Sequence, residues 1–207
     1  MSDNPSMAYS SFAGKSMPMN EKLPEFAMIG VYEKPSVNEL KFVRITSKQF
    51  KNKYSVILFM DNKASELELK EWTSFSDSIG DFKKLNVRIF GVCTDSHVAV
   101  RSFMTEHHLQ NIKFPIISDR TGDLSRSFGV LKITKDPSGG VNFDAARALA
   151  ILNDKMELVY LSLKNELTAS DPEEIMNVIK AIKRTSDSTS IHQSSKADTK
   201  NTVSDQK

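Results

Sequence analysis

Short apolar segments of strand length alternate along this chain with segments of helical periodicity, and this alternation limits the folds open to it. We expect strands at 41–45, 54–60, 87–92 and 115–117. A helix is expected after each of the last three strands, at 65–85, 96–108 and 122–128 in turn. Two further strands, 147–152 and 157–163, flank a turn at 153–155 as a hairpin, and a last helix follows Asp171 with Pro172 at its first position. This order predicts an α/β domain in which helices cover both faces of a central mixed sheet.

The length and composition predict one domain with polar ends. The chain has 207 residues, of which 39% are hydrophobic, enough to form a core. Residues 1–22 are rich in Ser, Met, Pro and Asn and are expected to form a flexible arm. Residues 186–207 are almost wholly polar and are expected to be a disordered tail. The folded domain is therefore predicted to span residues 23–185.

The charge and cysteine content argue against several classes of function. A net charge of +2, from 28 basic and 26 acidic residues, gives no electrostatic reason to expect nucleic acid or an anionic membrane as a partner. No apolar stretch is long enough to span a membrane, and the N-terminal residues lack the apolar core of a secretion signal, so we expect a cytoplasmic protein. The single cysteine, Cys93, excludes an intrachain disulfide and a cysteine-rich zinc site. We expect neither a metal nor a cofactor.

Several collinear segments of the chain resemble one protein family. They are LPEF, KNKYSVILFM, SFSDSIGDFKKLNVRIFGV, TDSH, FPIISD, SFGVLK and RALAILNDK, in that order. Each is a weak signal alone, but together they resemble the typical two-cysteine peroxiredoxins of the alkyl hydroperoxide reductase C and thiol-specific antioxidant group. The resemblance implies the peroxiredoxin variant of the thioredoxin-like fold, which agrees with the predicted order of strands and helices.

The same resemblance implies an active site that lacks its reactive atom. The family has a Pro-x-x-x-Thr-x-x-Cys loop that opens a helix, and a distant Arg. Counted from Phe59 without gaps, Asp61 replaces the proline, Ser65 the threonine and Glu68 the peroxidatic cysteine. Glu71 matches a nearby family glutamate, and Arg147 matches the family Arg. The resolving cysteine of the family is also absent from the C-terminal tail.

The loss of the thiol predicts the loss of the reaction. In the family a thiolate attacks the peroxide, and the helix N-terminus and the Arg stabilise its charge. A carboxylate is a poor nucleophile toward peroxide and cannot pass through sulfenic acid. We therefore predict a protein without thiol peroxidase activity that acts as a scaffold, a chaperone or a redox-regulatory subunit.

Glu68 and Arg147 each allow two interpretations. Ser65 and Glu68 have the S-x-x-E spacing of a capping box, in which the carboxylate serves only the start of the helix. Alternatively, Glu68 occupies the anion pocket, pairs with Arg147 and mimics the charge of a sulfinated cysteine; both interpretations can hold at once. Arg147 is either a pocket-facing cation, as the resemblance implies, or a strand residue that faces solvent.

Cys93 is the basis of an alternative function. It ends the strand at 87–92, where the family usually has Ser, and a small buried residue is the simpler interpretation. The alternative is a thioredoxin-dependent peroxidase that uses Cys93 as a displaced thiol, although the neighbouring Asp95 would raise its pKa.

The resemblance also predicts partners. The strand at 157–163 matches the family's edge strand that pairs across a two-fold axis, so we expect a homodimer. A ring oligomer, a mixed assembly with an active peroxiredoxin and an interaction with thioredoxin are further possibilities.

Overall fold

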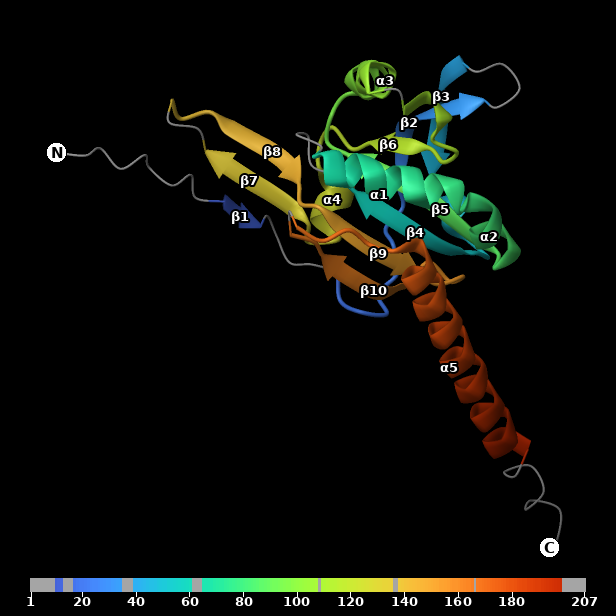
Figure 1. Cartoon of the computed structure of the whole chain (residues 1–207). Coiled ribbons are helices and arrows are strands. Elements are labelled where there is room, and N and C mark those ends of the chain that lie inside the picture. Colours follow the sequence, from blue (N-terminus) through green and yellow to red (C-terminus); the bar gives the residue numbers. More distant parts are fainter. Residues whose placement is uncertain are drawn as a thin grey trace, which may run out of the picture. The chain divides into compact units, whose positions relative to one another are not determined.

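The computed structural model describes residues 10–12, 17–34, 39–60, 65–107, 109–135, 138–165 and 167–198. The chain forms two units, residues 1–171 and residues 172–207. The described part of the second unit is one helix, α5 (Pro172–Asp198), which begins where the sequence predicts. The first unit contains the sheets and the remaining helices (Figure 1).

A seven-stranded mixed sheet forms the centre of the first unit. Its strand order is β10-β9-β4-β5-β6-β2-β3. The central strands β4, β5 and β6 are parallel, and the outer strands are antiparallel to their neighbours. The bounds are β2 (Ala27–Lys34), β3 (Glu39–Thr46), β4 (Tyr54–Phe59), β5 (Val87–Cys93), β6 (Ile116–Ser118), β9 (Ala148–Leu152) and β10 (Leu158–Leu163). The mixed sheet and the terminal hairpin β9–β10 confirm the prediction.

Helices cover both faces of this sheet. They are α1 (Glu66–Asp77), α2 (Ile79–Lys84), α3 (His97–Glu106) and α4 (Asp123–Ser127), with short 3-10 turns η1 (Ser47–Phe50) and η2 (Leu109–Asn111). Successive residues of β5 alternate between the faces. Gly91 faces Trp72 of α1, whereas Phe90 and Val92 belong to the apolar cluster that includes Leu124 of α4.

The structure differs from the prediction in several elements. The helix expected over 65–85 is divided at Ser78 into α1 and α2. Strand β2 was not expected, because AMIGVYEK contains Gly30 and charged residues and lacks a clear alternation. A second sheet, β1-β7-β8, was also not expected; it consists of β1 (Ser10–Phe12), β7 (Leu131–Lys135) and β8 (Val141–Ala145).

Both ends of the chain contain more regular structure than the sequence analysis expects. Strand β1 lies within the predicted arm and pairs with β7. Helix α5 continues to Asp198, beyond the predicted domain boundary at residue 185. Residues 186–198 contain neither Gly nor Pro, so nothing in their sequence ends a helix that has already started.

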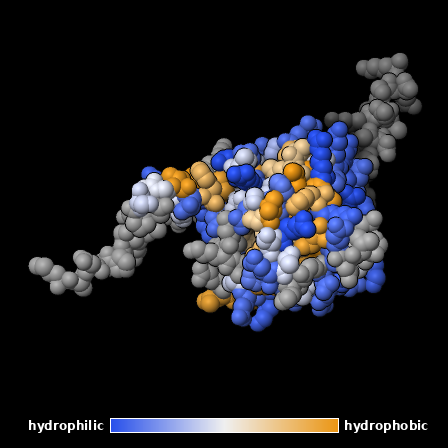
Figure 2. Space-filling view, turned by 90° about the horizontal axis from the view of Figure 1, so that it is seen from above, coloured by the Kyte–Doolittle hydropathy of each residue, from blue (hydrophilic) through white to orange (hydrophobic). Residues whose placement is uncertain are grey.

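Part of the apolar surface remains exposed. Ile29, Phe42 and Val98 are among the large apolar residues that are at least 43% exposed. Figure 2 shows apolar patches set among hydrophilic residues on the face seen from above. Within the described residues, no helix is long and apolar enough to cross a membrane.

The position of α1 on the sheet depends on a glycine. Trp72, the only tryptophan, is 1% exposed and lies directly over Gly91 of β5. A Cβ atom at residue 91 would lie 2.7 Å from Cη2 of Trp72, which is closer than real Cβ contacts. The missing side chain therefore allows the start of α1, with Glu68 and Glu71, to lie close to the sheet.

We expect Gly91→Ala to lower the free energy of unfolding by about 1–3 kcal/mol, because the added methyl group overpacks the contact with Trp72. Urea denaturation followed by the fluorescence of Trp72 measures this change. Gly80→Ala is the matched control: nothing lies within 4 Å of its Cβ position in α2. The control should be neutral or stabilising by up to about 1 kcal/mol. Equal effects of the two substitutions would contradict this packing account.

Candidate functional site

The candidate site begins where β4 ends and α1 starts. All six residues of β4 are buried, which fixes the strand in the sheet. Asp61 lies outside the described residues, and the described chain resumes at Ser65, the N-cap of α1. The Ser65 hydroxyl accepts a hydrogen bond from the Glu68 amide at 3.3 Å. Glu68 Oε2 in turn accepts from the Ser65 amide at 2.8 Å and from its hydroxyl at 3.0 Å. The predicted capping box is therefore present.

Arg147 lies beside this helix start and is buried. It immediately precedes β9, and it is 7% exposed, so the solvent-facing interpretation is wrong. Its Nε atom lies 3.7 Å from Oε1 of Glu68. The helix cap and the approach to Arg147 are therefore both present, because one oxygen of the Glu68 carboxylate serves the cap and the other faces the guanidinium.

The closest partner of Arg147 is Glu71. Arg147 Nη2 donates to Glu71 Oε2 at 2.6 Å, and both side chains are at most 8% exposed. Glu71 lies one helical turn after Glu68, so both carboxylates project from one face of α1. Glu71 is expected from the sequence only as a match to a family glutamate, and its contact with Arg147 is not predicted.

The backbone of the segment after β10 completes the site. Arg147 Nη1 donates to the carbonyl oxygen of Asn165 at 2.8 Å. The amide of Ser170 donates to Glu71 Oε1 at 2.6 Å. Sequence reasoning missed Asn165 and Ser170 because main-chain groups take part, and these leave no signal in the type of side chain.

The charges of the site are compensated by several groups together. One guanidinium faces two carboxylates, so the three side chains carry a net negative charge when all are ionised. The N-terminus of α1 and the Ser65 and Ser170 amides stabilise the remaining negative charge. Arg147 Nε has no hydrogen-bond acceptor among the described residues, so Glu68 acts on it through charge alone. The site thus holds the Glu68 carboxylate beside the Arg147 guanidinium and the start of α1.

Cys93 has no part in this cluster. It ends β5, is 2% exposed and is a free thiol. The pKa of the Cys93 thiol is raised to about 12, chiefly by burial; a backbone hydrogen bond at Asp95 lowers it, and the carboxylates of Asp95, Asp119 and Asp144 add to the increase. At neutral pH the sulfur therefore stays protonated, which makes it a poor nucleophile.

The described residues contain no group of three or more His, Cys, Asp or Glu side chains that could hold a metal ion. The side chains of the candidate site are one guanidinium, two carboxylates and one hydroxyl.

We expect Arg147→Met to lower the free energy of unfolding by about 3–5 kcal/mol, because it leaves two buried carboxylates without their cation. Urea denaturation followed by Trp72 fluorescence gives the value. Arg126→Met is the control: Arg126 pairs with Asp123 at 2.8 Å, but both side chains are at least 41% exposed. That substitution should change stability by no more than about 1 kcal/mol.

A rescue separates charge from packing in this experiment. If charge is the cause, adding Glu68→Gln and Glu71→Gln to Arg147→Met should recover part of the lost stability. A loss no larger than that of Arg126→Met would contradict the assigned role of Arg147.

Similarity to known proteins identifies the family of this chain. The AhpC/TSA family model matches residues 19–161, a range that includes Ser65, Glu68, Glu71 and Arg147. A putative peroxiredoxin, ycf42 of Porphyra purpurea, is 30% identical over 77% of this chain and 75% of its own length. The chloroplastic 2-Cys peroxiredoxin BAS1 of Hordeum vulgare is 29% identical over 79% of this chain and 74% of its own.

The solved structures agree in fold. Enterococcus faecalis AhpC superposes with a TM-score of 0.68 at 22% identity and covers 82% of this chain and 94% of its own. This confirms the predicted peroxiredoxin variant of the thioredoxin-like fold. The chain belongs to the AhpC/TSA family.

Proposed function

We propose that this chain is a family member without thiol peroxidase activity, and that it acts as a scaffold, a chaperone or a redox-regulatory subunit. The observation that carries this proposal is the position of the Glu68 carboxylate. It lies at the start of α1, accepts hydrogen bonds from Ser65 and faces Arg147 at 3.7 Å. A carboxylate thus occupies the position that the family resemblance assigns to the reactive thiolate.

The chemistry of the two groups differs in one essential step. A thiolate attacks one peroxide oxygen: a sulfur–oxygen bond forms, the oxygen–oxygen bond breaks, and the leaving oxygen takes a proton. The sulfur is oxidised to sulfenic acid while the peroxide is reduced. The carboxylate of Glu68 has no atom that can donate two electrons to a peroxide. Residue 68 therefore carries a negative charge, as a thiolate would, but it cannot reduce a peroxide.

The contacts of the site favour a structural role. The capping box joins Ser65 to Glu68, and the buried pair of Arg147 and Glu71 joins α1 to the segment before β9. A carboxylate held beside Arg147 carries the charge that a sulfinated cysteine would carry. We infer that the start of α1 is held in one folded state, which suits a protein that presents a constant surface to a partner.

The alternative function is a thioredoxin-dependent peroxidase that uses Cys93. Its burial and its pKa of about 12 weigh against this function, because little thiolate forms at neutral pH. Thioredoxin is a partner only under this alternative. The cytoplasmic location stays a prediction from the sequence.

The proposal is tested by measuring hydrogen peroxide consumption with thioredoxin or dithiothreitol as the reductant. We expect the rate with the wild-type chain to equal the rate without protein, since neither Glu68 nor the protonated Cys93 is a suitable nucleophile. The Cys93→Ser variant should give the same rate. Consumption by the wild type that disappears in Cys93→Ser would refute the proposal in favour of the alternative.

We further propose that β10 pairs with a second copy of this chain. β10 is an edge of the seven-stranded sheet. Its first residue, Leu158, is covered because its amide and carbonyl bond to Glu21 and Asn20, whereas residues 160–163 pair with β9 alone among the described strands. An open strand edge of this kind can pair with its own copy across a two-fold axis.

Analytical ultracentrifugation tests this assembly. We expect the wild type to sediment as a dimer, or as a larger assembly built from dimers. Leu163 is 53% exposed at the end of the open edge, so Leu163→Asp should shift the protein toward the monomer without unfolding it. A wild-type monomer at high protein concentration would contradict the proposed pairing, whereas a ring or a mixed assembly with an active peroxiredoxin would extend it.

A further inference from the structure

Strand β3 forms the second edge of the seven-stranded sheet, and part of this edge is open. It pairs with β2 alone among the described strands. The Ser47 amide donates to the Phe26 carbonyl oxygen, so these two residues form a hydrogen-bonded pair of the antiparallel ladder. Because such pairs alternate with pairs whose main-chain groups point outward, the amides and carbonyls of Leu40, Phe42 and Arg44 point away from β2. No described residue forms a hydrogen bond with these outward groups.

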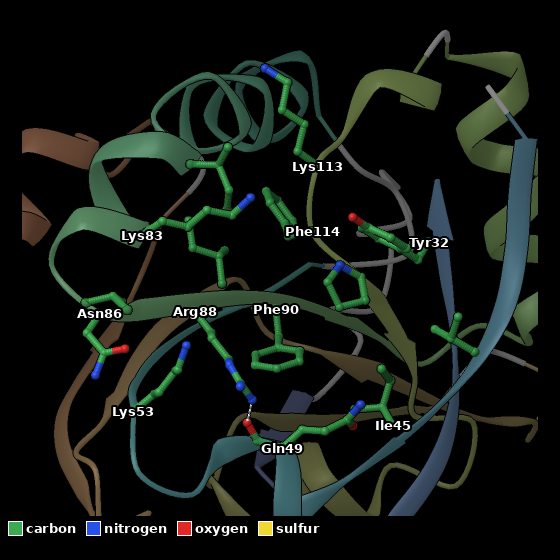
Figure 3. Close-up of a pocket in the computed structure, with 15 residues that line it drawn as sticks. Tyr32, Ile45, Gln49, Lys53, Lys83, Asn86, Arg88, Phe90, Lys113 and Phe114 are labelled. Carbon is green, nitrogen blue, oxygen red and sulfur yellow. Dashed lines mark hydrogen bonds between the residues drawn. The ribbon is translucent and has the colours of Figure 1, made fainter. Parts of the chain in front are cut away.

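The open part of this edge has a defined end at Thr46. The Thr46 amide also points away from β2, but it donates to Oε1 of Gln49 at 2.8 Å. The Gln49 carbonyl oxygen in turn accepts from Nη1 of Arg88, which joins η1 to β5 (Figure 3). A further strand can therefore pair with β3 only as far as Arg44.

Helix α3 lies beside the open edge and forms a groove with it (Figure 1). The Phe42 side chain packs edge-on against His97, with the ring centroids 4.9 Å apart, and Cζ of Arg101 lies 5.7 Å from the centroid of the Phe42 ring. This β3–α3 groove has a volume of about 460 Å³ and is lined by Phe42, Val98, Arg101, Ser102, Thr105 and Glu106. Residues 98, 101, 102 and 105 lie on one face of α3, because they are three or four positions apart. That face and the Phe42 side chain therefore border the same space.

The groove exposes apolar surface to solvent. Phe42 and Val98, which line it, are 45% and 58% exposed. Phe42 is in register with the buried Val31, so both side chains lie on the face of the sheet that α3 covers. Strand pairing at this edge would place an added side chain directly beside Phe42. An apolar side chain at that position would cover the surface of Phe42 and Val98.

The groove also carries positive charge that no described carboxylate neutralises. Arg44 and Arg101 are exposed, and neither lies within ion-pair distance of a described carboxylate. Lys41 of β3 pairs with Glu39 at 3.3 Å. The acidic residue of the groove lining, Glu106, is the last residue of α3, beyond Arg101. An anionic group is therefore favoured near Arg44 and Arg101.

We propose that the β3 edge binds an extended peptide segment of a partner protein in which an acidic residue stands two positions before an apolar residue. The segment pairs antiparallel with β3, which is the more stable of the two strand arrangements. Its apolar side chain lies opposite Phe42, and its acidic side chain lies opposite Arg44 on the same face. In an antiparallel segment the residue opposite Arg44 comes first, which sets this order. Main-chain hydrogen bonds supply affinity, and the alternate side chains supply specificity.

A second copy of this chain fits the β3 edge less well than such a peptide. Pairing of β3 with itself across a two-fold axis would place Arg44 and Arg101 of both copies around one short ladder. Like charges brought together in this way destabilise the pairing. The β3–α3 groove shares no residue with the Glu68–Arg147 site, so peptide binding and the loss of peroxidase activity are tested independently.

The test uses the full chain and a fluorescein-labelled peptide, Thr-Asp-Thr-Phe-Thr-Thr, whose binding is followed by fluorescence anisotropy. Methylation of the phenylalanine amide nitrogen should weaken binding at least about tenfold, because it removes a hydrogen bond to Phe42 and keeps the strands apart. The matched control is methylation of the threonine amide between the aspartate and the phenylalanine. That amide points away from β3, so the affinity should change by less than about threefold.

A charge reversal tests the acidic position of the peptide. Arg44→Glu should weaken binding at least about fivefold, because an attraction becomes a repulsion. A peptide with lysine in place of the aspartate should bind Arg44→Glu at least about fivefold more tightly than it binds the wild type. The control is Lys155→Glu, with the same change in charge in the exposed turn between β9 and β10, at the other side of the sheet. It should change the affinity by less than about twofold, because salt screens distant exposed charges.

Three results would overturn the proposal once circular dichroism has confirmed that each variant is folded. They are no binding of the peptide to about 1 mM protein, equal effects of the two methylations, and equal effects of the two charge reversals. A change in the sedimentation of the chain caused by Arg44→Glu would also overturn it, because the β3 edge would then belong to a second copy.

Discussion

The buried guanidinium of Arg147 holds together the candidate functional site of this protein. Arg147 lies between two carboxylates of α1 and a backbone carbonyl of the segment after β10. Removing a charge from water is unfavourable unless its partners are close and well oriented. The pair with Glu71 at 2.6 Å meets this requirement and joins the sheet to the helix. The close packing of α1 over Gly91 keeps both carboxylates within reach.

The same cluster explains how residue 68 can be a carboxylate in a member of the AhpC/TSA family. The start of a helix and a nearby Arg stabilise any anion there, whether thiolate or carboxylate. The family fold is retained, while residue 68, where the resemblance places the peroxidatic cysteine, is a glutamate. The only sulfur that could replace it, Cys93, is buried among carboxylates and remains protonated. The proposed loss of peroxidase activity follows from this arrangement of charges.

Local interactions were predictable from the sequence, whereas distant ones needed the family or the structure. The spacing of Ser65 and Glu68 predicts the capping box, because its two residues lie in one helical turn. Arg147 was assigned to the pocket only by the collinear resemblance. The contacts of Asn165 and Ser170 use backbone groups, which no residue pattern reveals.

The most direct test of the central claim is the pKa of a thiol placed at residue 68. It is measured from the ultraviolet absorbance of the thiolate in a Glu68→Cys/Cys93→Ser variant. If Arg147 and the start of α1 still form an anion pocket, this pKa should lie below the ordinary value of about 8.5, and the thiol should be oxidised by hydrogen peroxide to sulfenic acid. Adding Asp61→Pro and Ser65→Thr should increase that reactivity. An ordinary or raised pKa would contradict the claim that Arg147 and the start of α1 stabilise an anion at residue 68.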